Sequence, residues 1–245
     1  MTAAGVAGTM RGRRPVRAGP AAYGRELRVR AWLIRHGQSE SNAGLPTNGP
    51  GTAPLTALGR QQAGRVAESF TEEPALIVSS SFVRARQTAE PTRRRFPGRP
   101  YEEWPVQEFT YLGGLHGPAT TAEQRRPHAA AYWERSDPHY VHGGDGESFA
   151  DLMGRVDDLL GRMADRPTGL VAVFTHGLFM RAVVWSLLTG GHEKPDTDRM
   201  RDYQRFNRRF ATPNGCIVEL RWTGDGPLVL GSVTHHPPHL VSGVG

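Results

Sequence analysis

Short apolar runs that alternate with helical segments place the tightest constraint on the fold of this chain. The runs at 29–34, 75–79 and 170–175 leave little room for a solvent-facing side, which is typical of strands buried on both faces. After each run, apolar residues recur at helical spacing. This alternation predicts a mostly parallel sheet with helices on both faces. We therefore expect an α/β fold with three layers, α/β/α.

Several expected helix starts carry a residue that can accept a hydrogen bond from free backbone N–H groups. Thr56 precedes a helix expected over 57–70, and Ser81 precedes the next one. Ser148 and Asp151 have capping-box spacing, ahead of an apolar stripe that we interpret as core. The other expected elements are strands at 101–106, 216–222 and 228–233, a helix at 178–188, a turn at 223–226 and an irregular stretch at 191–213.

The excess positive charge lies in the first residues of the chain. Seven arginines and one glutamate in residues 1–30 account for the whole formal net charge of +6. Because this Gly/Ala/Pro/Arg-rich segment cannot build a core, we expect a basic, disordered leader at 1–28 and one domain at 29–245. A basic arm could contact nucleic acid, but we expect no such partner, since the rest of the chain is electrically balanced.

The composition also bears on the compartment. Cys216 is the only cysteine, which excludes an intramolecular disulfide and does not indicate an oxidising environment. No apolar run approaches the roughly 20 residues that span a membrane, and none follows the leader's arginines as in a secretory signal. We therefore expect a cytoplasmic protein without a membrane partner. The oligomeric state stays open, with a dimer as one option.

Periodicity disappears between Glu108 and Gly146, in a stretch rich in Gly, Pro, His and aromatic residues. A segment of this length without clear elements is usually functional or disordered. We expect a partly helical cap, inserted over about 108–146, that covers a binding site. The side chains that could either line its pocket or merely pack are His116, Tyr132, Trp133, His139 and His142.

Two expected strands that are far apart in the chain end in the same dipeptide, His-Gly. In a parallel sheet, His36 and His176 would both emerge at the carboxyl edge, where α/β proteins bind ligands. Arg35 flanks the first histidine, and Arg84 lies in the first turn of a helix, where backbone N–H groups favour anions. Arginine binds phosphate oxygens and imidazole is a nucleophile, so these residues suit phosphoryl transfer.

The chain lacks the sequence motifs that other phosphatase mechanisms require. Arg221 follows Cys216 at five residues, so the cysteine-phosphatase spacing C-x5-R is missing. Lys194, the only lysine, lies in no G-x-x-x-x-G-K-[ST] loop, and no paired acidic motif indicates a two-metal centre. We therefore expect no cofactor and no metal. The one histidine cluster, interpreted as part of a flexible tail, is His235, His236 and His239.

Six segments together resemble the histidine phosphatase superfamily, which includes cofactor-dependent phosphoglycerate mutases and acid phosphatases. They occur in the family's order and span roughly residues 30–190. Each is weak alone, but the combination is specific. The segments are R-H-G-Q-S-E-S-N (35–42), L-T-A-L-G-R-Q-Q-A (55–63), S-S-S-F-V-R-A-R-Q-T-A (79–89), Q-E-F (107–109), G-G-D-G-E-S (143–148) and T-H-G (175–177).

The resemblance implies a role for each matching residue. His36 would accept the phosphoryl group, and Glu108 matches the family's acid/base carboxylate. The residues that would hold the oxygens of the transferred group are Arg35, Arg84, His176 and Asn42. Fixed positive charge of this kind can serve where other enzymes use magnesium. The arginines should also lower the pKa of His36, which keeps the imidazole able to attack.

The chain departs from phosphoglycerate mutases in two places. Phe109 stands where mutases carry an arginine that meets the substrate carboxylate, and the loop between Asn42 and Leu55 lacks the usual mutase residues. Because fewer cationic contacts favour attack by water, we expect a phosphomonoesterase that acts on a small phosphorylated metabolite. Mutase activity is the alternative, and binding through the leader is a hypothesis of a different class. Sugar phosphates, nucleotides and small phosphorylated acids all remain open as substrates.

Overall fold

The computed structural model describes residues 29–115, 117, 119–166, 168–190, 194–223 and 226–232. The expected leader at 1–28, the turn centre at 224–225, the histidines at 235–239 and the pocket candidate His116 lie outside the described residues. The expected strand at 228–233 is present in its described part.

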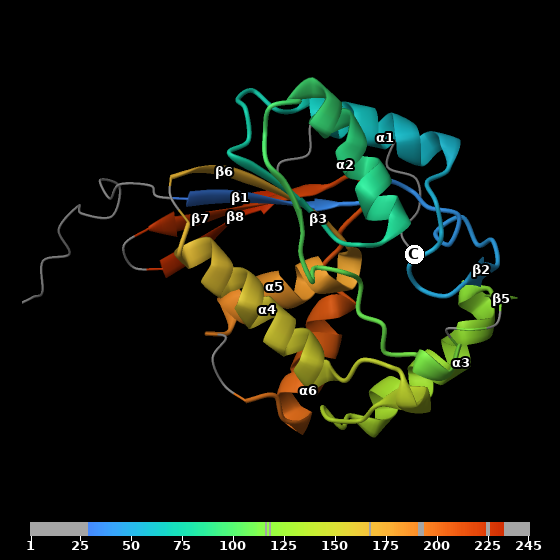
Figure 1. Ribbon diagram of the computed structural model, residues 1–245. Coiled ribbons are helices and arrows are strands. Elements are labelled where there is room, and N and C mark those ends of the chain that lie inside the picture. The colour runs from blue at the N-terminus through green and yellow to red at the C-terminus, as the bar shows by residue number, and fades with distance from the viewer. Residues whose placement is uncertain are drawn as a thin grey trace, which may run out of the picture.

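A six-stranded sheet forms the centre of the molecule, in the order β4-β3-β6-β1-β7-β8 (Figure 1). The first four strands in this order are mutually parallel, and β7 and β8 are added antiparallel. The mostly parallel sheet is therefore confirmed. The strands are β1 (Val29–Arg35), β3 (Leu76–Ser79), β4 (Tyr101–Glu103), β6 (Gly169–Thr175), β7 (Ile217–Thr223) and β8 (Gly226–Ser232).

Helices cover both faces of this sheet, as Figure 1 shows. Alternate residues of β1 separate into two cores: Leu33 packs in the cluster with α4 and α5, and Ile34 packs in the cluster with α1 and α2. This two-sided burial is the reason for the nearly continuous apolar runs, and it confirms the α/β/α layers. The helices are α1 (Ala57–Glu68), α2 (Val83–Arg95), α4 (Phe149–Ala164) and α5 (Gly177–Leu188).

Helix caps are present at two of the three positions where the sequence predicts them. Thr56 accepts a hydrogen bond from Gly59 N, and Ser148 and Asp151 form a complete capping box. The prediction for Ser81 is wrong, because α2 is preceded by Phe82, which has no side-chain cap bond. The stripe of α4 is buried core, as expected.

Two element predictions need correction. The stretch expected to be irregular at 191–213 contains α6 (Thr197–Asn207), which Asp196 caps and which buries Met200 and Tyr203. So few apolar positions in a charged segment give a weak helical signal. Strand β4 ends at Glu103 rather than continuing to 106, because Pro105 has no N–H to donate to a ladder.

The cap region at 108–146 is partly helical, as expected. Helix α3 (Ala122–Arg135) is its main element, and a short pair of strands ties the cap to the loop after β1. The minor elements are β2 (Thr47–Asn48), β5 (Ala119–Thr120) and the 3-10 turns η1 (Gly113–Leu115) and η2 (His142–Gly144). Figure 1 shows α3 and this strand pair at the end of the sheet where β1 and β3 lead into their loops.

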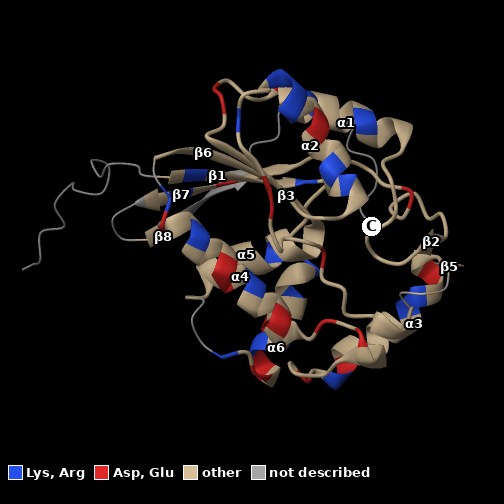
Figure 2. Ribbon diagram, viewed as in Figure 1, with Lys and Arg blue, Asp and Glu red and all other residues tan. Residues whose placement is uncertain are grey.

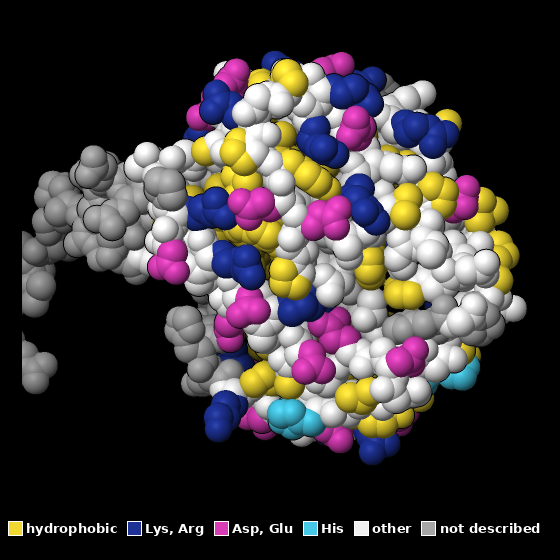
Figure 3. Space-filling view, in the orientation of Figure 1, with side chains coloured by type: hydrophobic (Ala, Val, Ile, Leu, Met, Phe, Trp, Pro, Cys, Tyr) yellow, Lys and Arg dark blue, Asp and Glu magenta, His cyan; other side chains and the backbone are white. Residues whose placement is uncertain are grey.

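Charged side chains of both signs are interspersed over the helices (Figure 2). The space-filling view shows the same mixture on the surface drawn there (Figure 3). Much of this charge is paired, as in the ion pairs of Arg86 with Glu103 and of Arg166 with Glu102. Exposed pairs of this kind contribute little to stability, so the fold depends mainly on its two apolar cores.

Two glycines let α1 approach the loop that follows β1. A Cβ atom on Gly59 would lie 2.0 Å from the backbone oxygen of Gln38, and one on Gly37 would lie 2.3 Å from the oxygen of Gly59. Backbone cannot yield as a flexible side chain does. We therefore expect Gly59→Ala to lower the free energy of unfolding by about 1–3 kcal/mol in urea denaturation.

Gly64, on the same helix, provides the matched control, because a Cβ there meets nothing within 4 Å. Alanine at this position removes backbone entropy from the unfolded chain, so Gly64→Ala should raise the unfolding free energy by roughly 0.5–1 kcal/mol. Equal effects of the two substitutions would show that the close approach is unimportant.

Candidate active site

The ends of β1 and β6 bring the two histidines together. The strands are adjacent and parallel, with Arg35 opposite Thr175 in the register. One residue further on, His36 N donates to Thr175 O at 3.0 Å, and the rings of His36 and His176 lie 5.0 Å apart between centroids. The pairing of the two His-Gly dipeptides at one sheet edge is therefore as the sequence predicts.

His36 is held in one orientation by both of its ring nitrogens. Nδ1 lies 2.7 Å from Gly37 O, to which it can only donate, and Nε2 accepts from Arg84 Nε at 3.1 Å. This network assigns a neutral imidazole with its lone pair on Nε2. Burial lowers the pKa of His36 well below its usual value, and Arg84 and Arg35 lower it further. The expected direction is correct, but desolvation is the larger cause.

Arg84 is a buried cation at the start of α2, with only 7% of its surface exposed. Its Nη1 donates to Pro50 O at 2.6 Å, while Nε is directed to His36. Burial lowers the pKa of Arg84 to about 10, so the guanidinium stays charged at neutral pH. Its position in the first helical turn also places it among backbone N–H groups, which favour an anion.

Arg35 and His176 face the same place with part of their hydrogen-bonding capacity unused. Arg35 Nη1 donates to Thr212 O, and His176 Nε2 lies 2.6 Å from Ser80 Oγ. Within the described part of the chain, Arg35 Nε and His176 Nδ1 are buried without a partner. Burial lowers the pKa of both groups. Such unsatisfied donors and acceptors are costly in an empty site and become useful when a ligand satisfies them.

Glu108 reaches the site from the segment that leaves β4. Its Oε1 accepts from the backbone N–H groups of Leu178 (2.9 Å) and Phe179 (3.3 Å) in the first turn of α5. Arg155 stabilises this segment by donating to Gln107 O at 2.9 Å while it pairs with Glu147 at 2.6 Å. The carboxylate is thus fixed by a helix N-terminus and lies beside the two histidine strands.

Asn42 lies on the loop after β1, where other side chains occupy its oxygen. Asn42 Oδ1 accepts from Ser39 N at 3.2 Å and from Asn214 Nδ2 at 3.1 Å. These contacts tie the loop to the segment before β7. The expected phosphate contact of Asn42 stays a prediction.

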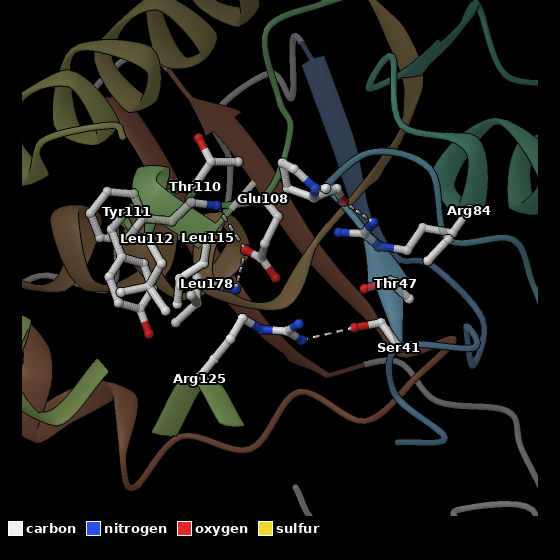
Figure 4. A pocket seen from close by; sticks show the side chains of 14 residues that line it. Ser41, Thr47, Arg84, Glu108, Thr110, Tyr111, Leu112, Leu115, Arg125 and Leu178 are labelled. Atoms are coloured by element: carbon white, nitrogen blue, oxygen red, sulfur yellow. Dashed lines mark hydrogen bonds between the residues drawn. The ribbon is translucent and has the colours of Figure 1, made fainter. Parts of the chain in front are cut away.

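A cavity of about 260 Å³ opens between two of these residues, Arg84 and Glu108, and the cap (Figure 4). Arg84 and Glu108 point into it, and the cap contributes Arg125 and an aromatic and aliphatic wall. Its full lining is Ser41, Thr47, Gly49, Pro50, Ala53, Arg84, Glu108, Phe109, Thr110, Tyr111, Leu112, Leu115, Arg125 and Leu178.

The comparison with known families matches this arrangement. The family described as histidine phosphatase superfamily (branch 1) matches residues 31–233, which include both histidine strands and the cap. The chain belongs to the histidine phosphatase superfamily. Its membership, together with the phosphatases among its relatives, makes the protein a phosphoric monoester hydrolase. Other relatives are named probable phosphoglycerate mutases.

Three relatives illustrate the similarity. The chain is 35% identical to a glucosyl-3-phosphoglycerate phosphatase of Mycolicibacterium vanbaalenii over 66% of this chain and 76% of that protein. It is 31% identical to a metal-independent phosphoserine phosphatase of Arabidopsis thaliana over 62% of this chain and 65% of that protein. The native structure of a mycobacterial glucosyl-3-phosphoglycerate phosphatase superposes with a TM-score of 0.59 at 26% identity, covering 82% of this chain and 96% of the other.

None of the helices in the described ranges is both long and apolar enough to cross a bilayer.

For the cap side chains of this histidine phosphatase that could either line the pocket or merely pack, the structure shows packing. Tyr132 and Trp133 pack among the cap's aromatic rings, with centroids 5.4 Å apart, rather than line the cavity. His142 accepts from Gly114 N at 3.3 Å, and His139 N donates to Asp137 at 3.0 Å. The aromatic side chains of the cap therefore extend the core that packs against α4 and α5.

Several site residues were not predicted from the sequence. Ser80 follows a strand within the segment 79–89, and this position was the signal that could have identified it as a site residue. Thr212 and Asn214 belong to the stretch before β7, where no pattern links them to His36. Arg125 and Ser41 meet only because the cap folds back over the loop after β1.

Proposed function

We propose that this enzyme hydrolyses phosphate monoesters of small metabolites through a phosphohistidine formed on His36. The observation that carries the proposal is the hydrogen bond from Arg84 Nε to His36 Nε2. It places the lone pair of a neutral, buried imidazole directly against a cation that can hold phosphate oxygens.

In the first step, His36 Nε2 attacks phosphorus, the P–N bond forms and the ester P–O bond breaks. Protonated Glu108 gives its proton to the departing oxygen, which leaves as an alcohol. Arg35, Arg84 and His176 bind the oxygens of the transferred group. When the phosphate binds, Arg84 Nε exchanges its bond to His36 Nε2 for a phosphate oxygen, which frees the lone pair for attack. The buried cations then stabilise the charge that develops in the transition state.

In the second step, the Glu108 carboxylate takes a proton from water, and the resulting hydroxide attacks phosphorus. The P–N bond breaks, inorganic phosphate leaves and neutral His36 is restored, with Glu108 protonated for the next cycle. Division of hydrolysis into two displacements is the usual advantage of a covalent intermediate.

Hydrolysis is favoured over mutase chemistry by the surroundings of Phe109. This residue is buried against the aromatic rings of Tyr111 and Tyr132, at 5.0 and 6.0 Å between centroids. The position where mutases carry an arginine thus offers no cation to retain a twice-phosphorylated intermediate. The named relatives act on glucosyl-3-phosphoglycerate and phosphoserine, which supports a small phosphorylated acid as substrate.

Incubation with 3-phosphoglycerate separates the two activities, with inorganic phosphate and 2-phosphoglycerate measured in the same reaction. We expect phosphate release, together with the dephosphorylated acid in equal amount. The reaction should need no bisphosphorylated compound as a primer, because the proposed mechanism has no twice-phosphorylated intermediate. The rate should therefore be the same with and without such a compound. Formation of 2-phosphoglycerate without phosphate would contradict the proposal.

A further inference from the structure

Arg125 is a second cation in the active-site cavity that the two-step mechanism does not use. It belongs to the second turn of α3, in the cap, and lines the same cavity as Arg84 and Glu108. Figure 4 shows its guanidinium directed toward Ser41, to which it is joined by a dashed line.

The guanidinium of Arg125 is held in place by the start of its own helix. Nη1 donates to Thr120 O at 2.6 Å and to Thr120 Oγ1 at 2.9 Å. The capping box of Thr121 and Gln124 fixes the backbone at this helix start. Among the described residues, Nη2 has only a long contact to Ser41 Oγ, at 3.5 Å, so its hydrogen-bonding capacity remains available on the cavity side.

No acidic side chain in the described ranges forms an ion pair with Arg125, although ion pairs are frequent in this chain. Arg155, by comparison, pairs with Glu147 at 2.6 Å. Arg125 is half-buried, and this burial lowers its pKa. A partly desolvated cation with neutral partners alone gains most from an anion that binds beside it.

We propose that Arg125, together with Ser41, binds a carboxylate on the substrate, so that the enzyme selects phosphate esters of small carboxylic acids. This inference rests on the proposed function, because it assumes that the transferred phosphate occupies the cations Arg35 and Arg84. One positive charge then remains in the cavity, and a single carboxylate complements it. Two oxygens of a carboxylate also match the adjacent donors of a guanidinium and a hydroxyl.

The test uses two pairs of esters, each differing by one carboxylate. They are 3-phosphoglycerate with glycerol 3-phosphate, and O-phosphoserine with phosphoethanolamine. We expect kcat/KM of the natural enzyme to be at least about tenfold higher for the acid of each pair. Arg125→Gln should lower kcat/KM for the acids by about tenfold to a hundredfold, mainly through KM, because Arg125 takes no part in the two chemical steps. Its activity on glycerol 3-phosphate, which has an uncharged end, should not change, and its activity on phosphoethanolamine, which ends in an ammonium group, should not fall.

Arg126→Gln is the matched control, since Arg126 is the exposed neighbour on the same helix and does not line the cavity. It should leave all four kcat/KM values unchanged. Equal losses on acids and on their partners in Arg125→Gln would overturn the inference, as would a natural enzyme that hydrolyses both members of each pair equally, or neither. Failure of the proposed function is distinguished by His36→Ala, which would then retain hydrolysis of every ester.

Discussion

Replacement of His36 by alanine should lower kcat by about 10⁴-fold or more and abolish the covalent intermediate. The loss should be large because, in the proposed mechanism, Nε2 is the atom that attacks phosphorus, and the cations around it cannot replace a nucleophile. Hydrolysis of p-nitrophenyl phosphate measures the rate. Rapid quenching in alkali with ³²P-labelled substrate measures the intermediate, because phosphohistidine survives base and is lost in acid.

The control for this substitution is His128→Ala, at an exposed histidine on α3 outside the cavity. This variant should keep both the turnover and the alkali-stable label. Retention of labelled protein in the His36→Ala variant would contradict the assignment of the nucleophile. Inorganic phosphate should still bind to that variant, as measured by calorimetry, because Arg35 and Arg84 remain in place.

Glu108→Gln should give the second largest loss, and its size should depend on the leaving group. An alkyl phosphate needs a proton on its departing oxygen, so kcat should fall about 10²- to 10⁴-fold. A nitrophenyl ester needs no such proton in the first step. With that ester, the first turnover should be nearly normal and the labelled phosphoenzyme should accumulate, since Glu108 also activates water in the second step.

Glu134→Gln, at an exposed carboxylate of the cap, provides the comparison and should leave both esters unaffected. Equal losses of Glu108→Gln on alkyl and nitrophenyl esters, without accumulation of phosphoenzyme, would show that Glu108 acts only on structure. Such a role is conceivable on geometric grounds, because its carboxylate also accepts from the N-terminus of α5. Burst kinetics therefore distinguish a proton-transfer role from a structural one.

Local sequence patterns were sufficient to predict the elements whose structure depends on residues close to them in the sequence. The capping residues Thr56 and Ser148 and the stripe of α4 depend on contacts within one or two turns. The meeting of His36 and His176 also follows from the sequence, although 139 residues separate them in the chain. Parallel strands share a carboxyl edge, so two strands with the same ending present that ending at one place.

Contacts made by irregular segments could be identified only in the three-dimensional structure. Thr212 and Asn214 hold Arg35 and the backbone of His36, yet no periodicity marks them, because a loop is positioned by what it packs against. The same holds for Arg125: a surface arginine in the helical pattern becomes a cavity residue only when the cap covers the loop after β1. The proposed nucleophile and the cations around it are thus recognisable from short sequence motifs, whereas the shape and charge of the substrate pocket arise from long-range packing.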